Sequence, residues 1–92
     1  SAYASPELLN NEPCPATDQY ALAVSYYELR TGRQAVDPDR ALIAILNGEL
    51  DLAGLPDDEA AVIRRATAVE PRDRYPDCQE MAAALKASAG GE

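Results

Sequence analysis

Apolar runs with helical spacing alternate with short breaks rich in Gly, Pro, Asp and Asn, and no stretch is a convincing β-strand. The longest run predicts a helix over residues 17–30, with Thr17 as its cap and Thr31-Gly32 as its end. Its middle, residues 20–27, is apolar or aromatic nearly all round, which is typical of a helix surrounded by protein. Because 92 residues can hardly surround a helix, we expect a larger body to be missing.

Shorter helices are predicted on both sides of this run. Residues 6–10 suit one short helical stretch, because Pro6 can open a helical turn and Asn10 can close it. Downstream, Asp39 is expected to cap a peripheral helix that stops at Gly48. The apolar residues of that helix recur at helical spacing and are Ala41, Leu42, Ile45 and Leu46.

Two further helices complete the chain. Pro56 and the carboxylates after it predict a helix start, and this helix should end near Val69. Asp77 is expected to begin the last helix, and residues 88–92 form a small, Gly-rich segment expected to be a flexible tail. The core-facing positions are predicted to be Ala60, Val62, Ile63 and Ala66 in the former and Cys78, Met81, Ala82 and Leu85 in the latter. The predicted class is all-α, a short first helix plus four main helices.

Charge and composition argue against several classes of function. A formal net charge of −8 with scattered basic residues argues against a nucleic-acid surface. Cys14 and Cys78 lie far apart and the chain has no His, so we expect no metal site. No apolar run approaches the length of a membrane span, and no signal-peptide pattern is present, which favours a cytoplasmic setting. The absence of an initial Met suggests a segment of a longer protein.

Three motifs follow one another in a fixed order. Residues 3–7 read Y-A-S-P-E, residues 18–24 read D-Q-Y-A-L-A-V with Y-E-L-R-T-G at 27–32, and residues 70–76 read E-P-R-D-R-Y-P. They resemble the A-P-E, D-x-W/Y-S-L-G-V, Y-E-L-L-T-G and D-P-x-x-R-P elements of the Ser/Thr protein kinases. The resemblance implies that residues 1–87 are a partial kinase domain, the helical part of the large C-lobe without the N-lobe and catalytic loop.

The chain also departs from the family pattern. Ser5 replaces the Ala of A-P-E, Ala23 replaces the usual Gly of the central helix, and the late motif has Glu70 for Asp and one extra residue before its proline. Ala35-Val36 stands where Pro-Phe is common. The changes at Ala23 and at Ala35-Val36 touch no catalytic chemistry and indicate a divergent member.

The resemblance implies supporting roles for particular residues. Glu7 and Arg74 would form an ion pair that clamps the end of the activation segment to the loop before the last helix; alternatively, Glu7 only favours a helix start and Arg74 is solvated. Asp18 corresponds to a family residue that accepts hydrogen bonds from the catalytic loop, or is an ordinary first-turn Asp. Tyr3 would help to position a substrate or is a packed aromatic, and Tyr20 with its tyrosine neighbours is expected to be core.

The implied activity belongs to the intact parent. Phosphoryl transfer needs a Gly-rich loop, a strand Lys, an H-R-D-type Asp and a D-F-G Asp, and none of these motifs is present here. The resemblance therefore implies that the parent, with ATP and Mg, phosphorylates protein Ser or Thr. The chain itself is expected to have no catalytic residue and no cofactor and to act as a platform, with the missing N-terminal part of the domain as its partner.

Two other classes of protein remain open. The first is a scaffold or protein-interaction module derived from a pseudokinase. The second is an unrelated adaptor-type helical bundle, which the absence of a repeat disfavours. Self-association through the uncovered central helix is a further hypothesis.

Overall fold

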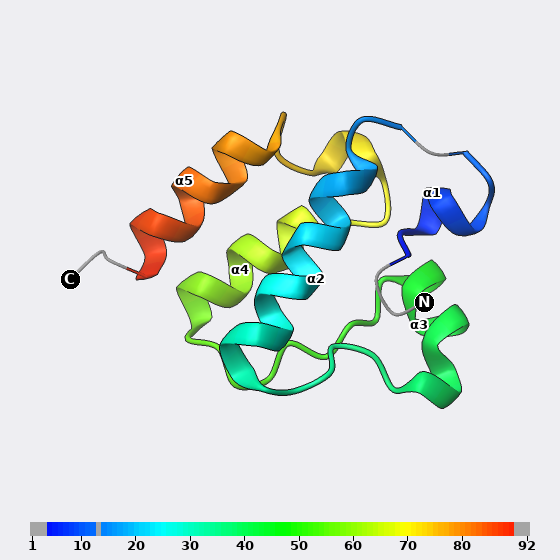
Figure 1. Cartoon of the computed structure of the whole chain (residues 1–92), viewed down its shortest axis with the longest axis horizontal. Coiled ribbons are helices and arrows are strands. Elements are labelled where there is room, and N and C mark those ends of the chain that lie inside the picture. Colours follow the sequence, from blue (N-terminus) through cyan, green and yellow to red (C-terminus); the bar gives the residue numbers. More distant parts are fainter. Residues whose placement is uncertain (1–3, 13, 90–92) are drawn as a thin grey trace.

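The computed structural model describes residues 4–12 and 14–89. The described residues contain no β-strand, which confirms the all-α class with a short first helix and four longer ones. The elements are α1 (Pro6–Leu9), α2 (Thr17–Thr31), η1 (Pro38–Arg40), α3 (Ala41–Asn47), α4 (Asp57–Ala66), η2 (Pro71–Asp73) and α5 (Cys78–Ala89), η1 and η2 being 3₁₀ turns. Figure 1 shows α2 in the middle, with α4 and α5 to one side and α1 and α3 to the other.

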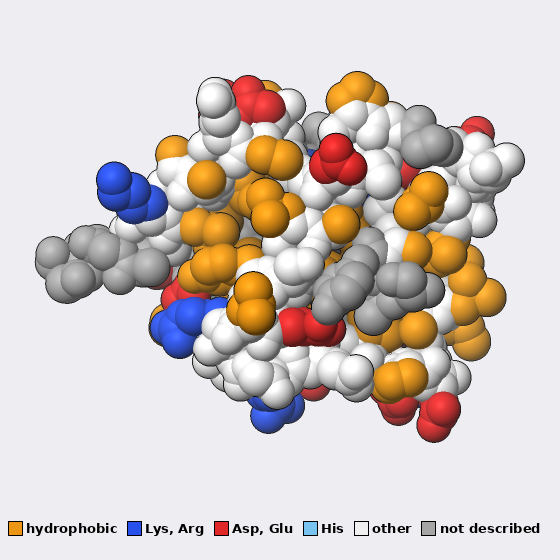
Figure 2. Space-filling model, in the orientation of Figure 1, with side chains coloured by type: hydrophobic (Ala, Val, Ile, Leu, Met, Phe, Trp, Pro, Cys, Tyr) orange, Lys and Arg blue, Asp and Glu red, His pale blue; other side chains and the backbone are white. Residues whose placement is uncertain are grey.

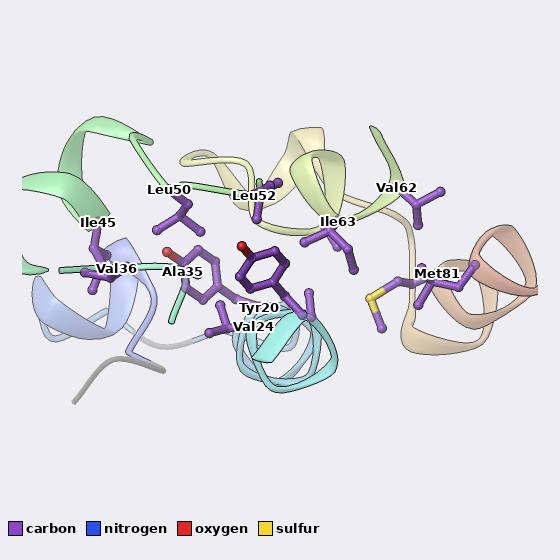
Figure 3. Packing of buried hydrophobic residues seen from close by; sticks show 14 residues of the cluster. Tyr20, Val24, Ala35, Val36, Ile45, Leu50, Leu52, Val62, Ile63 and Met81 are labelled. Carbon is purple, nitrogen blue, oxygen red and sulfur yellow. The ribbon is translucent and has the colours of Figure 1, made fainter. Parts of the chain in front are cut away.

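The hydrophobic core is a band that crosses α2. Tyr20, Tyr27 and Ile63 have 1% or less of their surface exposed, and α2 packs against α4 and α5. Figure 3 shows the band extending from Val36 and Ile45 at one end to Met81 of α5 at the other. Burying each of the large aliphatic side chains contributes about 1.5–3 kcal/mol, so the contacts with α2 hold the other helices in place.

The helix starts differ in part from the sequence predictions. Thr17 is the first helical residue of α2 and not its cap, because its hydroxyl donates to Glu7 instead of accepting from the helix. Asp39 is not a cap either, since the Asp37 carboxylate accepts from the Asp39 N–H at the start of η1. At α5 the prediction is confirmed, with Asp77 Oδ1 accepting from the Glu80 N–H at 2.8 Å.

The helix ends and faces also show differences. α4 ends at Ala66 and not near Val69, since the Ala68 N–H bonds to Arg65 O, three residues back, and leaves the helical pattern. The carbonyls of Ala68 and Val69 accept hydrogen bonds from Arg74. Ala82 is exposed, contrary to its predicted place on the buried face of α5. Because α5 continues to Ala89, helix occupies the first two residues of the predicted tail, and the rest of that tail lies outside the described residues.

Several apolar side chains remain on the surface. On α2, Leu22 is 49% and Leu29 is 88% exposed, so this helix is not covered all round. Others lie on α1 and α3, where Figure 2 shows hydrophobic side chains at the surface, and they are Leu8, Leu9, Leu42, Ile43 and Leu46. The predicted apolar spacing of α3 thus buries Ile45 fully but leaves Leu42 and Leu46 in contact with solvent.

Candidate functional site

A buried ion pair joins two segments that are 67 residues apart in sequence. Arg74 Nη1 lies 2.8 Å from Glu7 Oε2, and Arg74 Nη2 lies 2.8 Å from Glu7 Oε1. The Arg74 side chain has no exposed surface, and that of Glu7 is 8% exposed. The contact is therefore the bidentate, charge-assisted pair that the planar guanidinium favours, and it brings together the two residues for which the resemblance implied such a pair.

Backbone carbonyls complete the surroundings of the guanidinium. Arg74 Nε donates to Ala68 O at 2.8 Å, Nη1 also donates to Ala16 O at 3.0 Å, and Nη2 also donates to Val69 O at 3.5 Å. An arginine has five N–H groups, and each here has an acceptor. The cation is thus satisfied without water and ties α1, the start of α2 and the end of α4 to one point.

The carboxylate of Glu7 is equally well satisfied. Thr17 Oγ1 donates to Glu7 Oε2 at 2.8 Å and accepts from the Cys14 N–H at 3.0 Å. Burial acts to raise the pKa of Glu7, but hydrogen bonds from Arg74, its own backbone N–H and Thr17, with the charge of Arg74, outweigh burial and lower that pKa from 4.5 to about 2. Glu7 is therefore ionised at every ordinary pH. Arg74, Glu7, Ala16 and Thr17 together form the Arg74 clamp.

The sequence places this clamp through the starts of two helices. Ser5 caps α1, its Oγ accepting from the Leu8 N–H at 3.3 Å, and Pro6 follows as the first helical residue. Glu7 then lies in the first turn, where a carboxylate suits the helix dipole. The replacement of the family's Ala by Ser5 thus has a local function, which the sequence analysis did not assign.

Tyr20 lies against the clamp. The guanidinium carbon of Arg74 lies 5.0 Å from the centre of the Tyr20 ring, within the range of a cation–π contact. Burial raises the pKa of Tyr20 to about 12, so it stays neutral. Tyr20 and Tyr27 are core residues, and the Tyr27 hydroxyl donates to the Ala53 carbonyl.

Two other candidate residues lie apart from the clamp. Asp18 is exposed in the first turn of α2, where its charge suits the helix dipole, which is the ordinary role considered for it above. Its proposed contact with a catalytic loop would involve residues beyond this chain. Tyr3 lies outside the described residues.

A second ionic cluster, not foreseen from the sequence, lies at the other end of α2. Glu59, only 2% exposed, accepts from the Tyr26 hydroxyl and pairs with Arg30, whose Nε is 3.0 Å from Glu59 Oε2. Burial, and then the hydrogen bond to Glu59, raises the pKa of Tyr26. In the sequence, Glu59 stands out only as one of the carboxylates that follow Pro56 at the start of α4. A signal was present in the order of apolar residues, since Glu59 lies one helical turn before Val62 and Ile63.

Both ionic clusters join segments that are distant in sequence. Among residues 4–12 and 14–89, no three His, Cys, Asp or Glu side chains are grouped so that they would hold a metal ion. Within the same residues, no helix has the length and apolar character needed to cross a membrane. The described contacts around Arg74 join α1, the residue before α2 and the segment after α4.

Comparison with known proteins identifies the family. The chain is 36% identical to serine/threonine-protein kinase PknL of Mycobacterium tuberculosis over 98 aligned positions, covering 97% of this chain and 25% of that kinase. It is 35% identical to serine/threonine-protein kinase F of Synechocystis and to PknF of M. tuberculosis, in each case over 98% of this chain and over 18% and 21% of those kinases. No family model matches the chain, and no solved structure matches it significantly.

The matches cover nearly all of this chain but a quarter or less of each relative. The chain therefore belongs to the Ser/Thr protein kinase family, as the counterpart of one segment of those longer proteins.

Proposed function

We propose that this chain is the non-catalytic helical platform of a Ser/Thr protein kinase, which as a whole transfers the γ-phosphate of ATP to Ser or Thr residues of a protein substrate. The observation that carries the proposal is the buried, bidentate Arg74–Glu7 pair, which joins α1 to the segment before α5. The relationship to named Ser/Thr protein kinases supports the reaction class.

The clamp would act by pre-organising the chain around it. By resemblance, residues 3–7 are the end of the activation segment, which must keep one conformation for substrate to be held correctly. The clamp fixes Glu7 to α2 through Ala16 and to the end of α4 through Ala68. A reacting group misplaced by about 1 Å can cost roughly a hundredfold in rate, so a rigid anchor far from the chemistry is valuable.

ATP and Mg would be bound by the remainder of the kinase, since the sequence of this chain contains none of the motifs that hold them. We also propose a cytoplasmic setting, where ATP is available. The direct partner of the platform would be the N-terminal part of the kinase domain, and the exposed Leu22 and Leu29 of α2 offer it apolar contacts.

The test compares this chain with the product of its whole reading frame. Transfer of labelled phosphate from ATP to a generic protein substrate is measured, and the modified amino acid is identified after hydrolysis. The whole product should label Ser or Thr, and this chain alone should transfer nothing. No transfer by the whole product would favour the pseudokinase-derived scaffold, and labelling by this chain alone would overturn its role as a platform.

The role of the clamp is tested in the same assay by Arg74→Met in the whole product, with Arg72→Met as the matched control. Arg72 is two residues away, 82% exposed, and 3.8 Å from Glu70. We expect Arg74→Met to lower the rate about a hundredfold and Arg72→Met to leave it nearly unchanged. Equal rates for the two variants would contradict the clamp's role.

A further inference from the structure

Gln19 is a buried polar side chain that lies outside the Arg74 clamp but next to it in the chain. Gln19 is the third residue of α2, two positions after Thr17, and it is 1% exposed. Its Nε2 donates to Tyr75 O at 2.9 Å, and its Oε1 accepts from Tyr75 N at 3.1 Å. The amide therefore satisfies both backbone groups of one residue that is 56 positions away in sequence.

These two bonds imitate the pairing between neighbouring β-strands. Arg74 has extended backbone, with φ −79° and ψ −179°, and Pro76 favours extended backbone at Tyr75 as well. An extended residue presents its N–H and carbonyl to the same side, as in a strand. A carboxamide, with one acceptor oxygen and a donor nitrogen, is the side chain that matches this pattern. An apolar residue of the same size would fill the space but leave two partly buried backbone groups without this partner.

The contact acts on Arg74 through a covalent link. The Tyr75 N–H belongs to the peptide unit that joins Arg74 to Tyr75, so Gln19 fixes the plane of that unit. The Arg74 guanidinium meanwhile donates to the carbonyl of Ala16, the residue that directly precedes α2. The same end of α2 thus holds both the backbone and the side-chain tip of Arg74.

We propose that Gln19 is a positioning residue for Arg74, which sets the backbone of residues 74–75 against α2 so that the guanidinium meets Glu7 with both of its terminal nitrogens. Its consequence for phosphoryl transfer rests on the proposed function above. The contact itself is a property of this chain, and the tests below use the chain alone, so they fail or succeed independently of any kinase activity.

The first test uses Gln19→Glu. A neutral carboxylic acid has one donor and one acceptor and can replace the amide, whereas a carboxylate cannot donate and repels the Tyr75 carbonyl. Near pH 7, we expect the unfolding equilibrium constant of the variant to exceed that of the unchanged chain by about a hundredfold. Near pH 4, where the carboxyl is protonated, we expect this ratio of the two constants to be at least tenfold smaller.

Three charged groups lie near this contact. Arg74 and Glu7 form the ion pair described above, and the guanidinium of Arg65 lies 4.1 Å from the centre of the Tyr75 ring. They are present in both chains, so the difference between the two chains reports residue 19. Gln79→Glu on the exposed surface of α5 is the matched control and should show no such gap. A gap for Gln19→Glu that is equally large at both pH values would overturn the proposal.

The second test separates positioning of Arg74 from general support of the fold. In Gln19→Met, studied by NMR under conditions where the chain is folded, the Nε–H resonance of Arg74 is followed by its shift and its exchange with water. We expect faster exchange by about tenfold or more, because the guanidinium loses its fixed place, while Gln79→Met leaves the resonance unchanged. An unaltered Arg74 resonance in Gln19→Met would contradict the proposal. Should Gln19→Met not fold, Gln19→Glu near pH 4 and pH 7 gives the same comparison.

Discussion

The two ends of α2 are each fastened by a buried carboxylate, but the cations that pair with them differ. At the N-terminal end, the Arg74 side chain has no exposed surface, and Glu7 is 8% exposed. At the C-terminal end, Glu59 is 2% exposed while its partner Arg30 remains 47% exposed. In the Arg74–Glu7 pair both side chains are shielded from water, whereas in the Arg30–Glu59 pair only the carboxylate is shielded.

The difference shows what it takes to bury a charge. Arg74 has left water altogether, and its cost is offset only because every N–H group has an acceptor and Glu7 has a second donor in Thr17. Arg30 keeps much of its hydration, so its pair loses less on desolvation and is also screened by salt. The Tyr26 hydroxyl supplies the additional donor that Glu59 needs. Breaking the Arg74–Glu7 pair should therefore have the larger consequence.

Removal of the buried cation gives the largest expected effect. In Arg74→Met the carboxylate of Glu7 stays buried without its partner, and we expect a loss of about 3–5 kcal/mol in the free energy of unfolding. That is a large share of the ~5–14 kcal/mol expected for a domain of this size. Urea unfolding of the 92-residue chain measures the loss.

Arg74→Lys serves as the graded variant, because an ammonium keeps the charge but cannot form the two parallel bonds. It should lie between Arg74→Met and the unchanged chain. The exposed Arg72→Met should change the free energy of unfolding by less than about 0.5 kcal/mol. Equal losses for Arg72→Met and Arg74→Met would remove the distinction between buried and exposed cations.

The second-largest effect is expected at low pH, where acid should weaken the Arg74–Glu7 pair. The pKa of Glu7 in the folded chain, about 2, lies below its ordinary value of 4.5. The stability contributed by ionised Glu7 is therefore complete above its unfolded pKa and is lost as the pH falls toward about 2. We expect this part to be on the order of 2–3 kcal/mol.

The measurement is the difference in unfolding free energy between the unchanged chain and Glu7→Gln, followed from about pH 6 to about pH 2. Because Gln cannot titrate, the difference should shrink over this range as Glu7 takes up its proton. A difference independent of pH would mean that the charge of Glu7 contributes nothing to the fold.

Breaking the Arg30–Glu59 pair, whose cation remains partly exposed, should have the smallest effect on stability. Arg30→Met should cost about 1 kcal/mol, since Glu59 keeps the hydrogen bond from Tyr26. The loss should be smaller still in 1 M salt, where the screening length falls to about 3 Å, while the loss in Arg74→Met should stay nearly constant. Thermal or urea unfolding at low and high salt checks both; the same salt dependence in the two variants would erase the contrast between the ends of α2.

Much of the local structure could be predicted from the pattern of residues. Gly32 ends α2 with a left-handed φ of 71°, and Asp77 starts α5, as expected from ordinary capping rules. The predictions failed where a side chain serves a distant partner. Thr17 looked like a cap but donates to Glu7, and the segment after Ala66, predicted to be helical, instead presents the Ala68 carbonyl to Arg74.

The candidate site shows the same division. Glu7 and Arg74 were found only through the resemblance, because nothing in their own surroundings in the sequence marks a partner 67 residues away. Gln19 and Glu59 were missed as buried polar residues. A polar residue among apolar neighbours on a helix shows that something unusual is needed there, but not which distant group it meets.

The sequence by itself determined the class of the fold, the order of the helices and the family, because helix propensity, turn residues and motif order are carried by neighbouring residues. Only the tertiary structure decided which polar groups are buried and which partners they bind. Burial and long-range hydrogen bonds depend on where segments far apart in sequence meet, and the free energy of a buried charge depends on every donor or acceptor at that meeting point, as at Arg74.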